Sequence, residues 1–425
     1  MIRYADALHR VLDHAATLAA APCRTVDALG RVLAQAVTSP LALPSFDHAA
    51  MDGYALYARQ PLAAGSEHAV LGSQAAGDDS RASAGMAWEI MPGASLPDGL
   101  DAVVPVERTE LLARHDDGAP ARIRLLDSVR AGDNVRLAGS DVAPGAAALA
   151  AGTRLGPAQL MLLAALGVAQ VPVVRRARVA VICTGKELVA DPALMLGSGQ
   201  IHNSNGPYLV AALALAGAEV LSCETVDDTA VTFASALQRA REAGADLIVS
   251  TGAVSMGRYD FVPDMLGQLG AVELFHKVAM RPGKPLLAAV LGKGPLVLAL
   301  PGTPMAVAVG LRFFVAPVLR AMAGQPAEPG WRAVLDTPQQ PKAGLRHFLR
   351  ARLRQGEDGR LHASVLDHPQ PFRIQPFAEA DAWVVLPEEA GEVPAGALVE
   401  ITSLQPWQAF TVTQAPAERR PGNQA

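Results

Sequence analysis

The densest group of residues able to do chemistry lies in "ADLIVSTGAVSMGRYDFVPDML" (245–266). An apolar run from Leu247 to Val249 leads into hydroxyl side chains and glycines, namely Ser250, Thr251, Gly252, Ser255 and Gly257. Glycines allow a ligand to approach the backbone amides, and hydroxyls beside a helix start can hold phosphate or another oxyanion. Asp260 follows at the head of an apolar-periodic segment. It could cap a helix or hold a metal ion or proton, and spacing alone favours the cap.

Acids also follow the ends of two other apolar runs. Glu187 lies in "CTGKEL" (183–188) and could be a solvated acid at a helix start or a magnesium ligand. The Asp227-Asp228 pair in "VDDTA" (226–230) could cap the helix that follows. Since Mg²⁺ usually takes only one or two protein carboxylates beside water and substrate oxygens, a few acids at these loops would suffice.

Basic residues gather in "KVAMRPGKPLLAA" (277–289), where Lys277, Arg281 and Lys284 surround a Pro-Gly turn. In a chain of net charge −5 this cluster indicates a local anion site. An edge strand protected by lysines explains it equally well. A fourth loop, "LPGTP" (300–304), also follows an apolar run and leads into a helix. Together these loops predict a site for a phosphorylated small molecule.

The stretch "PSFDHAAMDGYAL" (44–56) also carries two acids, but Asp52-Gly53 is a turn signal that needs no function.

Composition narrows the class of protein. With 425 residues, 50% hydrophobic and 18% charged, the chain predicts two to four globular domains. Its acidic balance gives no support to a nucleic-acid partner. The three cysteines form no CxxC pair, which favours a reducing compartment over a disulfide framework or a cysteine-rich zinc site. No apolar run reaches membrane-spanning length and the N-terminus lacks a signal-peptide pattern, so we expect a soluble cytoplasmic protein.

The elements that would position these loops follow from periodicity. Residues 1–20 predict an amphipathic helix, 40–145 a region of short strands, and 152–167 a helix with Pro157 near its start. The apolar strands 178–185, 218–226 and 245–252 alternate with helical segments 205–217 and 229–243, which predicts a parallel sheet covered on both faces. Ligands bind such sheets at the carboxyl ends of the strands, where the loops above lie.

Further along the chain, a closing helix follows Pro304 and the pattern returns to strands. An alternating segment around Asp358-Gly359 (347–366) predicts a hairpin, and 381–387 and 397–404 predict further strands. The last dozen residues have the composition of a frayed tail.

Eight motifs, in order, resemble those of the MoeA/gephyrin E-domain family of molybdopterin molybdenumtransferases. They are "FDHAAMDGYA" (46–55), "MPGASLPDGLDAVVPVE" (91–107), "VRLAGSD" (135–141), "CTGKEL" (183–188), "GQIHNSN" (199–205), "STGAVSMGRYDF" (250–261), "KVAMRPGKP" (277–285) and "LPGTP" (300–304). One such motif would be weak evidence, but eight in the family's order are specific.

The resemblance implies a multidomain α/β plus β protein. Its expected parts are an elongated helical and extended domain (1–42 and 146–172), a β-rich insert (43–145), a MogA-like α/β domain with a parallel-rich sheet (173–326), a C-terminal β-barrel (327–412) and a flexible tail (413–425). Family members are homodimers whose cleft lies between the α/β domain of one subunit and the insert of the other.

The resemblance also implies the reaction: molybdate is inserted into adenylylated molybdopterin, AMP is released, and Mg²⁺ is the cofactor. The implied catalytic residues are Asp52, Glu187, Asp228, Asp260, Lys277 and Lys284, with Glu187, Asp228 and Asp260 as metal ligands. The expected substrate contacts are Ser250, Thr251, Gly252, Ser255, Gly257, Arg281, Pro301, Gly302, Pro304, Arg136 and Asp141. Expected partners are a second copy of the chain, molybdopterin intermediates and other cofactor-biosynthesis proteins, without nucleic acid or membrane.

Several positions depart from the family pattern. Pro92 and Lys186 replace a threonine and an acid, Ala253 and Thr303 replace a glycine and an asparagine, and Arg281 stands where lysine is common. Pro92 and Lys186 leave open a paralogue that binds pterin or nucleotide without turnover, and the MogA-like loop leaves open a molybdopterin adenylyltransferase.

Overall fold

The computed structural model describes residues 1–254, 261–366, 370–406 and 408–414. The chain divides into two compact units: unit 1 comprises Met1–Ala21 and Val174–Ala425, and unit 2 comprises Pro22–Val173. Residues 1–21 thus lie in unit 1, whereas the resemblance groups residues 1–42 with 146–172. The predicted domain boundaries stay predictions.

Unit 1 is built on a six-stranded sheet. Its order is β16 (Glu219–Val226), β13 (Arg178–Thr184), β17 (Leu247–Thr251), β21 (Leu296–Leu300), β20 (Leu287–Leu291) and β18 (Ala271–His276). The first four strands are parallel and the last two pair antiparallel. Every residue of β17 and β21 is buried, as expected for strands covered on both faces.

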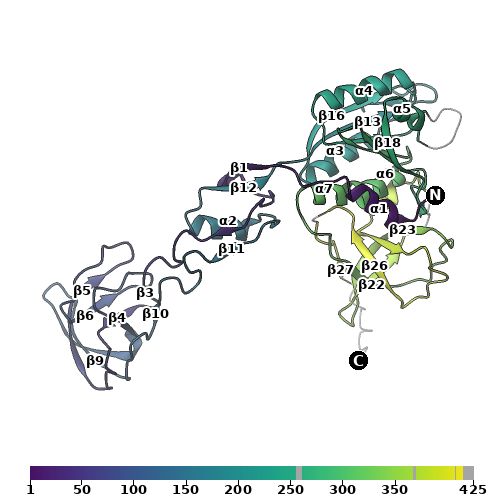
Figure 1. Cartoon of the computed structure of the whole chain (residues 1–425). Coiled ribbons are helices and arrows are strands. Elements are labelled where there is room, and N and C mark those ends of the chain that lie inside the picture. Colours follow the sequence, from purple (N-terminus) through teal and green to yellow (C-terminus); the bar gives the residue numbers. More distant parts are fainter. Residues whose placement is uncertain (255–260, 367–369, 407, 415–425) are drawn as a thin grey trace, which may run out of the picture. The chain divides into compact units, whose positions relative to one another are not determined.

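Helices cover both faces of this sheet (Figure 1). On one face lie α1 (Tyr4–Leu12), α3 (Asn205–Leu215) and a continuous helix made of α6 (Pro304–Gly310), η3 (Leu311–Val315) and α7 (Ala316–Met322). On the other face lie α4 (Ala230–Glu242) and α5 (Val262–Gln268). Val179 and Val181 of β13 enter the first core and Ala180 and Ile182 the second, which is the alternation of a two-faced strand.

Two predicted helices need comment. Helix Pro304–Met322 is long and apolar enough to cross a membrane, but 83% of its apolar stretch is buried inside the protein, as in a core helix. The N-terminal helix predicted over 1–20 ends at Leu12. Beyond it the chain extends, because the Leu18 amide donates to the main-chain oxygen of Met322 and β1 (Ala20–Arg24) pairs with β12 (Gln170–Val174).

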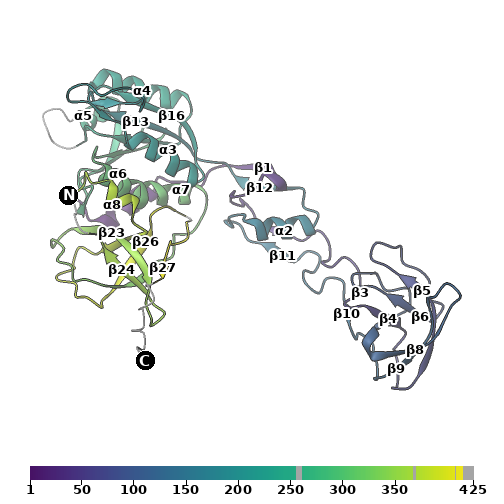
Figure 2. The same ribbon diagram turned by 180° about the vertical axis from the view of Figure 1, so that it is seen from behind.

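The C-terminal part of unit 1 is a closed five-stranded barrel, seen from behind in Figure 2. The strands β23 (Arg346–Gln355), β24 (Leu361–Val365), β22 (Trp331–Leu335), β26 (Leu398–Ser403) and β25 (Ala382–Leu386) follow one another, and β25 pairs back with β23. The predicted hairpin is confirmed as the antiparallel pair β23–β24. Two short strands, β19 (Met280–Arg281) and β27 (Thr413–Gln414), also pair with β23, and α8 (Gln375–Ala378) precedes β25.

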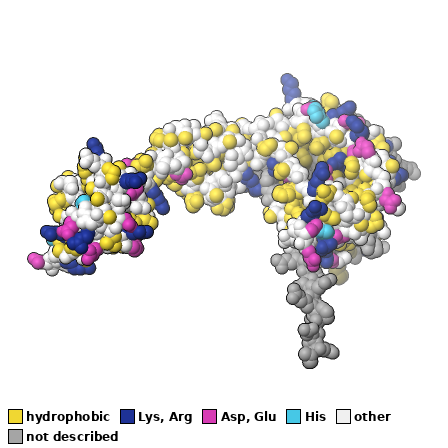
Figure 3. Space-filling view, turned by 90° about the horizontal axis from the view of Figure 1, so that it is seen from below, with side chains coloured by type: hydrophobic (Ala, Val, Ile, Leu, Met, Phe, Trp, Pro, Cys, Tyr) yellow, Lys and Arg dark blue, Asp and Glu magenta, His cyan; other side chains and the backbone are white. Residues whose placement is uncertain are grey.

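Unit 2 carries a six-stranded sheet. Its order is β7 (Ala102–Pro105), β4 (Gly53–Leu56), β6 (Ala87–Ile90), β5 (Glu67–Gln74), β9 (Pro120–Leu125) and β8 (Thr109–Arg114). Shorter pairs are β3 (His48–Ala49) with β10 (Val135–Arg136) and β2 (Val37–Thr38) with β11 (Ala147–Leu149). Helix α2 (Pro157–Ala165) begins at Pro157, as predicted. Figure 3 shows basic and acidic side chains interspersed on the visible face of this unit, and Arg124 pairs with both Glu67 and Glu110 at 2.8 Å.

The predicted fold class is thus confirmed: a parallel-rich α/β sheet, a β-rich insert and a C-terminal barrel occur in one multidomain chain.

The Asp246 side chain links the start of β17 to the start of β13, and its hydrogen bonds lead to a prediction about stability and pH. Its carboxylate accepts hydrogen bonds from both terminal nitrogens of Arg175 at 2.7 Å and from the Arg178 amide at 2.8 Å. Burial alone raises the pKa of Asp246, but these bonds outweigh it and hold the pKa below its ordinary value of 3.8. We expect Asp246→Asn to lower the free energy of unfolding at pH 7 by about 2 kcal/mol.

A carboxyl whose pKa is depressed by folding stabilises the protein above its unfolded-state pKa, and this contribution is lost as the pH falls through the folded value. The difference between native protein and Asp246→Asn in denaturant unfolding should therefore shrink below about pH 4. A difference that is the same at pH 7 and pH 3.5 would contradict this role for the carboxylate.

Candidate functional site

The loops after three neighbouring parallel strands meet at one edge of the unit 1 sheet. The register aligns Cys183 of β13 with Thr251 of β17, and Thr251 with Leu300 of β21. The hydroxyl of Thr184 donates to the main-chain oxygen of Thr251 at 3.0 Å, and the Gly252 amide donates to the Leu300 oxygen at 3.0 Å. This is the carboxyl edge at which such sheets bind ligands.

Gly252 packs directly against the loop that follows β13. Its φ is +92°, and a Cβ there would lie 2.5 Å from the Thr184 hydroxyl oxygen and 2.7 Å from the Thr184 main-chain oxygen. A side chain would therefore collide with the neighbouring loop. Glycine is therefore required at this position by the packing of the two loops, and the Gly252 amide, already bonded to the Leu300 oxygen, does not face a ligand.

Ala253 adopts the left-handed conformation, with φ of +48°, which glycine reaches without strain. For a residue with a Cβ this conformation costs about 1–2 kcal/mol. We therefore expect Ala253→Gly to raise the free energy of unfolding. Relief of the strain is partly offset by the greater backbone entropy of glycine in the unfolded chain, which leaves a net gain of about 1 kcal/mol. Thermal or denaturant unfolding checks this, and destabilisation by the substitution would contradict it.

A cavity of about 480 Å³ opens beside these loops. This volume lies within the range of small-molecule sites. Its lining includes Ala253, Arg281, Lys284, Pro301, Gly302 and Thr303. Arg281 and Lys284 are both exposed, so their charged groups are open to a ligand. Of the residues predicted from sequence, the structure thus brings together Arg281, Lys284, Pro301 and Gly302, while Pro304 begins the adjoining helix α6.

The basic loop is held in shape by its own backbone. The Val278 amide donates to the Lys284 oxygen at 2.9 Å, and the Leu286 amide donates to the Gly283 oxygen at 3.0 Å. Lys277 lies at the base of the loop with φ of +71°, donates its amide to Leu286 and accepts from the amide of Ile2. Lys277 is not among the residues that line the cavity, so the three predicted cations do not form one cluster there.

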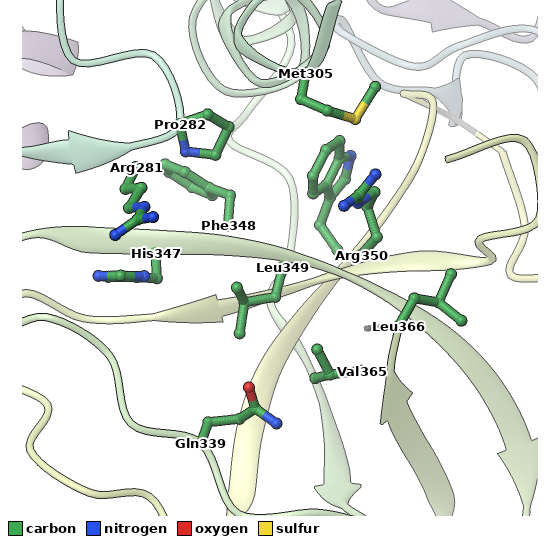
Figure 4. A pocket seen from close by; sticks show the side chains of 11 residues that line it. Arg281, Pro282, Met305, Gln339, His347, Phe348, Leu349, Arg350, Val365 and Leu366 are labelled. Carbon is green, nitrogen blue, oxygen red and sulfur yellow. The ribbon is translucent and has the colours of Figure 1, made fainter. Parts of the chain in front are cut away.

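A second cavity, of about 140 Å³, adjoins the first at Arg281 and Pro282 (Figure 4). Its other wall comes from the barrel and includes His347 and Arg350 of β23, which are only 7% and 5% exposed. Burial lowers the pKa of His347, whose Nε2 accepts the Lys342 amide at 3.1 Å. Arg350 donates to the main-chain oxygen of Arg373 at 2.8 Å.

Sequence reasoning missed these barrel residues. The segment "RHFLRARL" (346–353) did contain a signal for them, because it carries charged side chains at positions where the apolar pattern requires a buried residue.

The two described acids of the predicted metal set lie on adjacent loops. Asp228 accepts the Lys186 amide at 3.4 Å. A Cβ on Gly185 would lie 2.7 Å from Oε1 of Glu187, so the Glu187 carboxylate folds back over Gly185. The expectation that an aspartate caps α4 is wrong: Thr229 takes that position, and its hydroxyl accepts the Thr232 amide at 3.2 Å. Asp228 is therefore not needed as a cap.

Glu187 and Asp228 would supply only some of the ligands that a cation such as Mg²⁺ needs. Across the described residues, His, Cys, Asp and Glu do not converge in any group of three or more. Two carboxylates nonetheless fit Mg²⁺, which keeps several waters and takes substrate oxygens. The predicted third acid, Asp260, lies outside the described residues, as do Ser255 and Gly257.

Ser250 and Thr251 do not reach the cavity surface. They are 0% and 1% exposed, and the Ser250 hydroxyl has no hydrogen-bond partner in the described part of the chain. The interpretation of both hydroxyls as direct substrate donors does not fit this burial.

Unit 2 gathers three of the sequence motifs on its own. His48 pairs with Arg136 across β3 and β10, and the Ala138 amide donates to Oδ1 of Asp47 at 2.7 Å. The Gly93 amide donates to the Ala49 oxygen at 2.9 Å. The side chains of Asp52, Arg136 and Asp141 are exposed in this unit.

Asp52-Gly53 is not the hairpin turn that the sequence suggested. Gly53 begins strand β4, and a Cβ there would lie 1.9 Å from the Val104 oxygen of the paired strand β7. The glycine is required by close approach of two strands, and Asp52 is left exposed beside it.

Comparisons with known proteins agree with this geometry. The chain matches the MoeA N-terminal region (domain I and II) over residues 2–167, a probable molybdopterin binding domain over 180–321, and the MoeA C-terminal region (domain IV) over 332–404. It is 35% identical to a molybdopterin molybdenumtransferase of Synechococcus elongatus, over 95% of this chain and 100% of that protein. It is 37% identical to molybdopterin molybdenumtransferase 2 of Mycobacterium tuberculosis, over 89% and 93%.

Among solved structures, the molybdopterin biosynthesis MoeA protein of Pyrococcus horikosii superposes with a TM-score of 0.78 at 27% identity, covering 96% of this chain and 100% of that one. The similarity extends over the full length of the chain, the three family regions occur in order, and the fold matches. The chain therefore belongs to the MoeA family of molybdopterin molybdenumtransferases.

Proposed function

We propose that this chain is a molybdopterin molybdenumtransferase of molybdenum cofactor biosynthesis, which inserts molybdate into adenylylated molybdopterin and releases AMP. One observation carries the proposal: the cavity at the carboxyl edge of the sheet presents two exposed cations, Arg281 and Lys284, beside the Pro301-Gly302 loop. Both substrates are anions, and oriented cations at such an edge bind and neutralise oxyanions.

The described residues have separate roles in this proposal. Arg281 and Lys284 bind and orient phosphate or molybdate oxygens in the cavity. Glu187 and Asp228 would hold Mg²⁺, which, when bound, neutralises charge on the pyrophosphate oxygens. The packed loops around Thr184, Gly252 and Gly302 fix the distance between the cation-bearing loop and the acid-bearing loop.

The proposal includes a homodimer. Asp52, Arg136 and Asp141 belong to unit 2 and carry family motifs, so we place them opposite the unit 1 cavity of a second copy of the chain. Molybdopterin intermediates, and the proteins that supply them, are the proposed partners, and the cytoplasm is the proposed location.

The first test is AMP release from adenylylated molybdopterin, with Mg²⁺ present and with or without molybdate. We expect release that depends on molybdate and disappears in Asp260→Ala. Absence of AMP above background from the native chain would overturn the proposal.

One departure favours a second candidate, a protein that holds pterin or nucleotide without turnover. Lys186 is exposed and directly precedes Glu187, and its main-chain amide donates to Asp228, so its positive charge lies on the acid-bearing loop and can compete with a metal ion. Saturable binding in calorimetry without AMP release would support this candidate, and turnover would exclude it.

A further inference from the structure

Two of the three cysteines lie side by side on neighbouring strands. Cys183 is in β13 and Cys223 is in β16, and the parallel register pairs Val181 with Cys223 and Cys183 with Thr225. The two cysteines are thus offset by two residues, which places both side chains on the same face of the sheet.

Their sulfurs meet beneath one glycine of α3. A Cβ on Gly206 would lie 3.1 Å from Sγ of Cys223 and 3.4 Å from Sγ of Cys183. Both sulfurs therefore border the same small space, and Gly206 puts no side chain into it. The two thiols are thus close neighbours on one face of the sheet.

The two thiols differ in access and acidity. Cys223 is exposed on the edge strand, while Cys183 is buried. The neighbouring Cys223 thiol lowers the pKa of Cys183, opposed by burial and aided by Asn203 and Thr251, while Cys183 and burial raise the pKa of Cys223. Two thiols that share one favourable ionisation thus lie together, and one of the two sulfurs is reached by solvent; thiolate is the reactive form of cysteine.

We propose that Cys183 and Cys223 form an oxidation site at which hydrogen peroxide converts the two thiols into a reversible disulfide. One sulfur, as thiolate, attacks a peroxide oxygen; the O–O bond breaks, a sulfenic acid forms and, with uptake of a proton, one water leaves. The second thiol attacks that sulfur, forms the S–S bond and releases a second water. Hydrogen peroxide is reduced to water by the two electrons that the thiols lose.

The position of the pair connects it to the proposed active site. Cys183 directly precedes Thr184, whose hydroxyl bonds to the Thr251 oxygen next to Gly252. A cross-link to β16 would fix the strand end from which the 184–187 loop departs. The consequence for activity rests on the proposed function, whereas the cross-link itself does not.

The direct test treats native protein and Cys23→Ser with hydrogen peroxide, then titrates thiols and maps peptides by mass spectrometry. In native protein the three thiols should fall to one, and in Cys23→Ser both should disappear, with a Cys183–Cys223 peptide that dithiothreitol separates. Single variants Cys183→Ala and Cys223→Ala should show a trapped sulfenic acid instead. Oxidation of Cys223 alone in native protein, or disulfides only between molecules through Cys23, would overturn the proposal.

A second arm measures AMP release before and after peroxide. We expect at least a tenfold loss in native protein, recovery with dithiothreitol, and no loss in Cys223→Ala. If the disulfide forms without any change in release, its control of the site is refuted. If no preparation releases AMP, the proposed function fails while the thiol titration still decides the cross-link.

Discussion

Replacing Glu328 by alanine is expected to lower the free energy of unfolding of unit 1 by about 3–5 kcal/mol, because it leaves the buried guanidinium of Arg312 without its carboxylate partner. Arg312 lies in η3 and is only 3% exposed. One of its terminal nitrogens donates to both carboxylate oxygens of Glu328, at 2.8 and 2.7 Å, and its Nε donates to the main-chain oxygen of Ser403 at 2.8 Å. The pair joins the core helix, the connection to the barrel and strand β26.

The measurement is denaturant unfolding of the native protein and Glu328→Ala. Glu357→Ala is the matched control, since this acid is exposed in the turn between β23 and β24 and should change stability by less than about 0.5 kcal/mol. The double substitution Arg312→Met with Glu328→Ala should recover part of the loss, because no charge is then left unpaired. A loss no larger than that of the control would show that water reaches Arg312.

Much of the α/β sheet could be predicted from the sequence, for a physical reason. Strands buried on both faces must be apolar throughout, so β13 and β17 stand out as short continuous runs between amphipathic helices. The ligand edge follows directly, because parallel strands present all their carboxyl ends on one side. The meeting of the 184, 252 and 301 loops is a consequence of that topology.

What the sequence could not indicate depends on contacts between distant segments. The N-terminal pattern continues past Leu12, but pairing with Met322 extends the chain there. Asp228 and Thr229 are both good caps, and only the backbone path decides that Thr229 takes the position. Ser250 resembles a loop hydroxyl, yet it is the fourth residue of a fully buried strand.

The contact between the barrel wall and the basic loop could not be predicted from sequence for the same reason. Arg350 and His347 come from a strand that pairs in parallel with β19, the short strand of the basic loop. That pairing brings the barrel against Arg281, and neither segment carries a signal for the other.

Replacing Lys284 by alanine should reduce molybdate-dependent AMP release by about 10²–10³-fold, the usual effect of removing one oxyanion donor. Lys284 is exposed at the cavity, and the only loop contact described for it is its main-chain oxygen, which accepts the Val278 amide and is retained in alanine. The loop should therefore keep its shape while the cavity loses one of its two cations. Steady-state AMP release, with unfolding curves to confirm an unchanged fold, measures the effect.

Lys293 provides the matched control, because it is an exposed lysine in the turn between β20 and β21 and does not line the cavity. Lys293→Ala should keep native AMP release, which separates loss of a local contact from loss of general positive charge. Lys284→Arg keeps the charge but changes its geometry, so partial recovery would indicate that neutralising the oxyanion matters more than a single hydrogen bond. Equal rates for native protein and Lys284→Ala would place the anion away from this cavity, and the acids of the neighbouring loop would then become the first residues to replace.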